Sequence, residues 1–307
     1  MDLDTFVTYV YVMVDDYCKA HLAPDRHPGP GASLSRSEVI TLAMIGQWFQ
    51  FASERDFYET ISEKLGSAFP CLPDRSQYNR QVRRHAAALG EVGIGLGRAV
   101  GEARPWYEAM DSVAAPVRNA KRRGCSWLDG RASLGWSNRL GWFFGFRVLT
   151  CCSPRGVLTG YGCAPGATND RLLAETLFAS RATPHPRLPN VGHATDSVYL
   201  ADSNFAGAQW VPRWRTAYGV TVLASPQRDH PARWPRPLRR WVASHRQIIE
   251  TVHDRLIHCC RLETDRAHTL PGFLATLAAK VALHNACCLI NHRLGRPLLA
   301  TRGLLRL

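Results

Sequence analysis

Three acidic residues occur in sequence settings from which their carboxylates could converge on metal ions. Asp111 follows the short apolar stretch 107–110, Asp202 ends the strand-like stretch 198–202, and Glu250 lies in a segment whose apolar residues have helical spacing. Carboxylate oxygens are the ligands that Mg²⁺ prefers in proteins. We therefore expect two acids at strand ends and a third on a later helix to form one metal site.

The chemistry open to such a site is displacement at the phosphorus of a phosphodiester. Two Mg²⁺ ions roughly 3.5–4 Å apart can stabilise both the attacking and the leaving oxygen of that reaction. Asp111 and Asp202 are 91 positions apart, and Asp202 and Glu250 are 48 apart, so only the fold can bring them together. Spacing alone is weak evidence, because the chain's 25 acidic residues offer many such triples.

Each acid also has a purely structural explanation. Asp111 could be a turn residue at a strand end, and Asp202 could cap the following segment as an Asx turn. Glu250 could pair on a helix surface with residues four positions away, which are Arg246 and Asp254. The alternative metal ligands are Asp196, Asp129 and Asp170. Asp129 and Asp170 rank lower because neither ends a clean strand, and Asn169-Asp170 opens an expected helix, where capping is the simpler role.

The chain of 307 residues has a formal net charge of +13, and this charge is unevenly distributed. The first 100 residues contain 10 Lys/Arg and 12 Asp/Glu, which leaves 28 and 13 in residues 101–307. The three acids therefore lie in the strongly basic part. A basic surface attracts polyanions, and nucleic acid is the commonest of these in a cell. A solvated basic surface without a partner would have the same composition.

Three basic clusters are candidates for contacts with DNA phosphates. One lies on an expected helix near residue 80, one follows the stretch that contains Asp111, and one is interleaved with Trp210, Trp214, Trp234 and Trp241. Arginine binds phosphate and aromatic rings stack on unpaired bases, but the tryptophans could equally belong to a core. The candidates are Arg80, Arg83, Arg84, Arg118, Lys121, Arg122, Arg213, Arg215, Arg236, Arg239, Arg240 and Arg246.

The elements that must position these residues fall into two parts. The first hundred residues have helical periodicity, and one helix begins at a capping box formed by Ser35 and Glu38. A fourth helix is expected over residues 78–89. The glycine-rich segment 90–101 is then a candidate boundary between domains. We therefore expect an all-helical N-terminal domain over residues 1–100.

Residues 101–307 alternate between strand-like and helical patterns. The expected strands are 106–117, 143–150, 157–161, 198–202 and 219–224, and the expected long helices are 167–181, 239–262 and 270–294. This order predicts an α/β domain with a mixed sheet flanked by helices, followed by C-terminal helices.

The segments around the three acids resemble the DDE transposases of bacterial insertion sequences, whose catalytic domain is RNase H-like. Met110–Val113 is similar to the strand of the first aspartate in that family, and Leu200–Gly207 to the strand of the second. Arg246–Val252 has the family's arginine, three residues, glutamate signature. The likeness continues into 266–273 and 277–285, and it covers most of the chain.

The match also has departures. A widespread form of the signature has Tyr three residues before the arginine and Lys seven residues after the glutamate. Here those positions are Ala243 and Ile257, with His245 and Arg255 nearby. The three acids are unaffected by these differences, which put in doubt how the DNA end is positioned.

The resemblance implies a DNA transposase that cuts the ends of its own element and joins them to target DNA. Asp111, Asp202 and Glu250 would then be the catalytic residues and hold Mg²⁺, for which Mn²⁺ would substitute, and Arg246 would position a phosphate or the glutamate. The implied partners are the element's terminal repeats and target DNA, with the protein working as a homodimer or higher oligomer. Two alternatives remain: a metal-dependent nuclease without strand transfer, and a non-catalytic DNA-binding protein derived from a transposase.

The remaining sequence signals exclude other classes of protein. The ten cysteines include no Cys-x-x-Cys pair, which favours buried thiols in a reducing compartment. A zinc site built from His253, His258, Cys259, Cys260 and His268 lacks the usual ligand spacing, so helix packing is preferred. The N-terminus is acidic and no apolar run reaches membrane-spanning length. We expect a soluble cytoplasmic protein, associated with the bacterial nucleoid and without a membrane partner.

Overall fold

The computed structural model describes residues 1–25, 32–48, 50–101, 105–121, 127–183, 198–226, 234–264 and 266–304. These residues form two compact units. Unit 1 comprises Met1–Leu96, Arg255–Leu262 and Ala267–Leu307, and unit 2 comprises Gly97–Asp254 and Glu263–Arg266. The predicted division at residue 100 stays a prediction.

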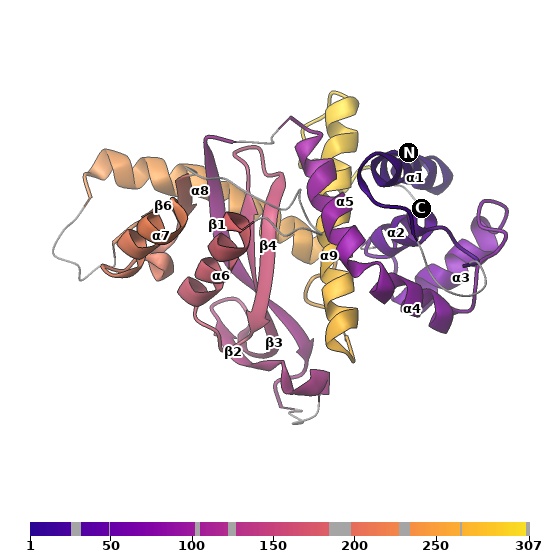
Figure 1. Cartoon of the computed structure of the whole chain (residues 1–307), viewed down its shortest axis with the longest axis horizontal. Coiled ribbons are helices and arrows are strands. Elements are labelled where there is room, and N and C mark those ends of the chain that lie inside the picture. Colours follow the sequence, from indigo (N-terminus) through magenta and orange to yellow (C-terminus); the bar gives the residue numbers. More distant parts are fainter. Residues whose placement is uncertain are drawn as a thin grey trace. The chain divides into compact units, whose positions relative to one another are not determined.

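Unit 2 is built around a mixed sheet (Figure 1). Its strands are β1 (Tyr107–Arg118), β2 (Ser133–Ser137), β3 (Gly141–Cys152), β4 (Leu158–Pro165), β5 (Val198–Ala201) and β6 (Thr221–Ala224). The order across the sheet is β2-β3-β1-β5-β6, and β4 also pairs with β3. Strands β2, β1 and β4 are antiparallel to β3, whereas β5 runs parallel to both β1 and β6.

Helices cover both faces of this sheet. On one face, α6 (Asp170–Ala182) and α7 (Trp210–Tyr218) contribute Phe178 and Trp214 to a core that contains Met110 and Leu149 of the strands. On the other face, α8 (Arg236–His258) contributes Val242 to a cluster with Tyr107 and Leu200. Successive strand residues point to opposite faces, so Tyr107 and Met110, three positions apart, reach different clusters. The predicted fold class, an α/β domain with a mixed sheet flanked by helices and preceded by a helical region, is confirmed.

A buried ion pair joins α6 to the strand that carries Asp111. Arg181 donates to both carboxylate oxygens of Glu108 at 3.0 Å and to the hydroxyl of Tyr199 at 2.6 Å. A Cβ at Gly160 would lie 2.2 Å from a guanidinium nitrogen of Arg181. Glycine at this position therefore permits the close approach of β4 to the Arg181 side chain.

Unit 1 is helical. It contains α1 (Leu3–His21), α2 (Arg36–Ile45), α3 (Glu54–Lys64), α4 (Arg75–Arg84), most of α5 (Ala86–Arg98), the last turn of α8 and α9 (Leu270–Arg293). The predicted capping box is confirmed: Ser35 accepts from the N–H of Glu38, whose carboxylate accepts from the N–H of Ser35.

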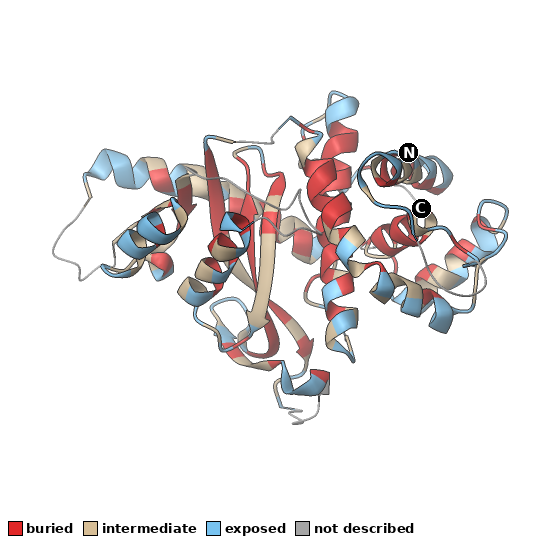
Figure 2. Ribbon diagram, in the orientation of Figure 1, coloured by how far each residue is buried: buried red, intermediate tan, exposed pale blue. Residues whose placement is uncertain are grey.

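Helix α9 is the core of unit 1. It is the single helix in the described parts of the chain with the length and apolarity to cross a membrane, but 89% of its apolar window is buried (Figure 2). Lys280 at its centre is fully buried and donates to the carbonyl oxygen of Cys260 at 2.6 Å and to Gln47 at 2.9 Å. These contacts satisfy an ammonium group that would otherwise be costly to bury.

The helical region differs in two details from the sequence pattern. The glycine-rich segment 90–101 is mostly helix, because it contributes to α5. A Cβ at Gly93 would lie 3.0 Å from the backbone of Ala282, so this glycine permits close packing of α5 against α9. The single helix expected over 78–89 is interrupted at His85, which ends α4. Strand β2 was not predicted.

Candidate functional site

Asp111 and Asp202 occupy equivalent positions on neighbouring parallel strands. The register of β1 and β5 pairs Ala109 with Leu200, and each aspartate lies two residues further along its own strand direction. Asp111 is still within β1, whereas Asp202 follows the last residue of β5. Because the two strands are parallel, this register brings both carboxylates to one place at the edge of the paired region.

Burial raises the pKa of both aspartates. Burial, with the charge of Asp202 as the second cause, raises the pKa of Asp111 to about 7. Burial is also the main cause that raises the pKa of Asp202. Two partly buried like charges are costly to ionise together. A cation between them would relieve this repulsion, so the pair has the chemistry of a cation ligand set.

Asp202 also has the structural role considered as an alternative. One of its carboxylate oxygens accepts the N–H of Asn204 at 2.9 Å, and the residue caps the short 3₁₀ helix η2 (Ser203–Phe205). The cap fixes the side chain at the end of β5, next to Asp111. Capping and ligation are therefore compatible for this residue.

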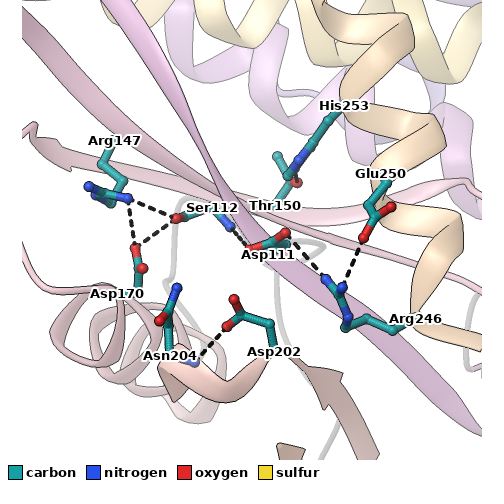
Figure 3. Close-up of polar contacts among 10 residues, drawn as sticks. All are labelled: Asp111, Ser112, Arg147, Thr150, Asp170, Asp202, Asn204, Arg246, Glu250 and His253. Atoms are coloured by element: carbon teal, nitrogen blue, oxygen red, sulfur yellow. Dashed lines mark hydrogen bonds and ion pairs between the residues drawn. The ribbon is translucent and has the colours of Figure 1, made fainter. Parts of the chain in front are cut away.

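Arg246 links the third acid to this pair (Figure 3). From α8, its guanidinium contacts Asp111 at 3.5 Å and Glu250 at 2.8 Å. Glu250 lies one helical turn after Arg246 and its side chain is 53% exposed. The helix pairing of Glu250 with Arg246 is thus present, and the same arginine brings Glu250 into the neighbourhood of Asp111.

Asp170 belongs to the same neighbourhood but is held by other groups. At the start of α6, it accepts from the hydroxyl of Ser112 at 2.7 Å and pairs with Arg147 at 3.4 Å. Its charge contributes to the raised pKa values of both Asp111 and Asp202. Asn169, and not Asp170, caps α6. Asp170 is therefore a fourth carboxylate near the pair, with a positively charged partner of its own.

A buried hydrogen bond on the α8 side of the sheet was not foreseen from sequence. Thr150 pairs in register with Asp111, and its hydroxyl lies 2.8 Å from Nε2 of His253. Burial, with a smaller contribution from Arg246, lowers the pKa of His253 to about 4, so the imidazole is neutral. Helix packing was the preferred interpretation of His253, and no local signal in the sequence indicates Thr150, Ser112 or Arg147.

The other proposed carboxylate ligands lie elsewhere or outside the described residues. Asp129 is exposed and has a left-handed backbone at φ 53° within the 3₁₀ segment η1 (Trp127–Gly130). Asp196 falls outside the described residues. Among the described residues, no group of three or more His, Cys, Asp or Glu side chains is gathered closely enough to hold a metal ion. The carboxylate oxygens of the three acids are ligands of the type that Mg²⁺ prefers. Arg246 lies between Asp111 and Glu250, so the three carboxylates are not gathered around one point.

The candidate DNA-contacting residues are spread over both units. Arg80, Arg83 and Arg84 lie on α4 of unit 1, where Arg84 pairs with Asp25 at 2.9 Å. Lys121 follows β1, Arg118 ends it, and Arg122 lies outside the described residues. On α7, Arg215 is exposed and Arg213 pairs with Glu175 at 2.7 Å. Arg236, Arg239 and Arg240 are exposed in the first turns of α8.

The four interleaved tryptophans are mainly packing residues. Trp214 is fully buried, in the core with Phe178. Trp210 also packs on that core, and Trp234 and Trp241 pack on the opposite face of the sheet. Trp241 stacks on His245 at 4.4 Å between ring centroids, and Trp106 lies 5.6 Å from Trp241 with 66% of its surface exposed.

Comparison with known proteins identifies the family. No curated protein and no solved structure matches the chain. The family model described as the transposase DDE domain matches residues 109–286, which is more than half of the chain and includes Asp111, Asp202 and Glu250. The resemblance inferred from the motifs is thereby confirmed, and the chain belongs to the DDE transposase family.

Proposed function

We propose that the protein is an active transposase that hydrolyses phosphodiester bonds at the ends of its own element and joins the freed 3′-hydroxyls to target DNA. The observation that carries this proposal is that Asp111 and Asp202 each lie two residues beyond the paired residues Ala109 and Leu200, with Arg246 connecting Asp111 to Glu250. Family membership supports transposase activity for this domain.

In this proposal Asp111, Asp202 and Glu250 hold Mg²⁺ or Mn²⁺. Such ions, when bound, activate a water or hydroxyl nucleophile and neutralise charge at the phosphorus. The protein's own contribution is positional. Strands β1 and β5 hold the two aspartates, the N–H of Asn204 orients Asp202, and α8 presents Glu250. Arg246 supplies positive charge beside the acids and can bind a DNA phosphate in a bidentate manner.

Basic residues in both units would hold the DNA backbone. The exposed arginines at the start of α8 precede Arg246 on the same helix. DNA that binds along this helix would therefore extend to the three acidic residues. The N-terminal helical region would bind the element end through α4. Because two ends must be cut and joined, we propose a homodimer or higher oligomer on DNA.

The test is a strand-transfer assay with the full-length protein, Mg²⁺ and a linear fragment that ends in the DNA flanking the gene. Joined product that disappears with Asp111→Asn, Asp202→Asn or Glu250→Gln supports the proposal, with Asp129→Asn as a matched control that stays active. Cleavage without joined product would make the protein a nuclease. Binding without cleavage would make it a DNA-binding derivative of a transposase.

A further inference from the structure

Helix α8 carries Glu250 between two contacts with the sheet. Arg246 precedes Glu250 by one turn and reaches Asp111, whereas His253 follows by nearly one turn and reaches Thr150. Residues seven apart on a helix point in nearly the same direction, so Arg246 and His253 share the face that meets the sheet. The two contacts therefore lie on either side of the glutamate (Figure 3).

The two contacts end on a cross-strand pair. Asp111 of β1 and Thr150 of β3 are directly opposite each other in the antiparallel register. Directly opposite residues have Cβ atoms roughly 4.5–5.5 Å apart and point to the same face. A contact to Thr150 therefore positions α8 relative to Asp111 almost as directly as a contact to Asp111 itself.

The pair formed by Arg246 and Glu250 cannot do this. Both residues belong to α8 and are four positions apart, so their bond leaves the helix free to shift against the sheet. The Arg246–Asp111 contact does cross to the sheet, but it is long at 3.5 Å and involves a candidate ligand. The bond between His253 and Thr150 is shorter at 2.8 Å and uses none of the candidate ligands. The hydrogen bond between His253 and Thr150 can therefore persist whether Asp111 contacts Arg246 or a metal ion.

We propose that Thr150 and His253 are positioning residues that set the separation of Glu250 from Asp111 and so tune the affinity of the site for divalent cations. This proposal rests on the proposed metal-binding role of the acids. Both side chains are buried, Thr150 completely and His253 to 8% exposure, so they act through the backbone of β3 and the axis of α8. We do not assign either as a catalytic residue, since each is argued to act only through the position of Glu250.

The experiment measures binding of Mn²⁺ alone to the full-length protein by the electron paramagnetic resonance signal of the free ion. Thr150→Val removes the hydroxyl with little change in shape and should raise the Mn²⁺ Kd about fivefold. Thr150→Ser keeps the hydroxyl and should restore the Kd to within about twofold. His253→Leu should match Thr150→Val, and the double variant should be no worse than either single variant because one bond is lost in all three.

A matched control separates this effect from general destabilisation. Thr41 of α2 is fully buried and its hydroxyl has no hydrogen-bond partner in the described structure, so Thr41→Val tests the same chemical change without a bond. Its Mn²⁺ Kd should stay at the wild-type value. A thermal melt of every variant shows whether a changed Kd accompanies a folded protein.

Two failures can be told apart. If Asp111→Asn and Glu250→Gln abolish Mn²⁺ binding while Thr150→Val leaves it unchanged, the positioning proposal is wrong and the metal site stands. If the Asp111→Asn and Glu250→Gln variants also bind Mn²⁺ normally, these acids do not form a metal site and the proposed function is wrong. Additive losses in the double variant would likewise overturn the idea that Thr150 and His253 act through their mutual bond.

Discussion

The guanidinium of Arg246 contacts the carboxylate of Asp111 across 135 positions of sequence, and the same group binds Glu250. Sequence proximity explains the second contact, because the two residues are one helical turn apart. The first contact exists only because α8 lies over the sheet beside β1. The contacts of Arg246 therefore depend on the tertiary arrangement of the site, and replacing Arg246 is a direct way to perturb that arrangement.

Replacing Arg246 should slow DNA cleavage by roughly a hundredfold for alanine and about tenfold for lysine. Alanine loses the charge, and lysine keeps the charge but cannot bridge two acids with a planar fork. Cleavage rates at saturating Mg²⁺ measure the effect. The matched control is Arg55→Lys, which alters another i,i+4 pair with a glutamate, on α3. Equal activity of Arg246→Lys and wild type would show that the bridge has no role.

DNA binding should weaken with salt, and the exposed arginines at the start of α8 should carry part of that dependence. Each phosphate contact adds about 0.9 to the slope of log K against log salt. Replacing Arg239 and Arg240 by glutamine should thus lower the slope by roughly 2. Arg213→Gln should change it less, because Arg213 already pairs with Glu175. Fluorescence anisotropy over a salt series measures the slopes. An unchanged slope for the double variant would show that the start of α8 does not contact DNA.

The positions of the three acids were predictable because each lies in a local pattern. Asp111 lies within the pattern that forms β1, Asp202 directly follows the stretch that forms β5, and Glu250 lies in a long amphipathic pattern that forms α8. Which strands pair was not predictable from those patterns. The parallel register that aligns Asp111 with Asp202 depends on packing of α6, α7 and α8 on the sheet, which involves residues far apart in sequence.

The groups around the acids could not be found for a similar reason. Thr150 belongs to a buried strand and looks like any β-branched residue there, while its partner His253 is 103 positions away. Glycine has low helix propensity, and in α5 the close approach of Gly93 to α9 outweighs that propensity. Strand β2 has only five residues, among them two serines and a glycine, and offers little alternation.

The buried Glu108–Arg181 pair should be essential for the stability of unit 2. Arg181→Met leaves a buried carboxylate without its partner, so we expect a loss of about 3–5 kcal/mol in the free energy of unfolding. Replacing both residues, as Glu108→Leu with Arg181→Met, should recover much of that loss. Urea denaturation measures these values. The control is the pair Arg213–Glu175, whose arginine side chain is 63% exposed, and Arg213→Met should cost no more than about 1 kcal/mol. A small effect of Arg181→Met would mean that water reaches Glu108.

His253 should make the protein less stable in mild acid. Its pKa is about 4 in the folded protein, against about 6.5 for an unperturbed histidine. As the pH falls from about 6.5 to about 4, the unfolded chain takes up a proton at this residue and the folded protein does not, so up to about 3 kcal/mol of stability is lost in that window. In His253→Leu this part of the pH dependence should vanish, whereas His292→Gln, at an exposed position, should retain it. Urea titrations at several pH values between 4 and 7 measure the difference, and parallel curves for His253→Leu and wild type would show that His253 is not held neutral by burial.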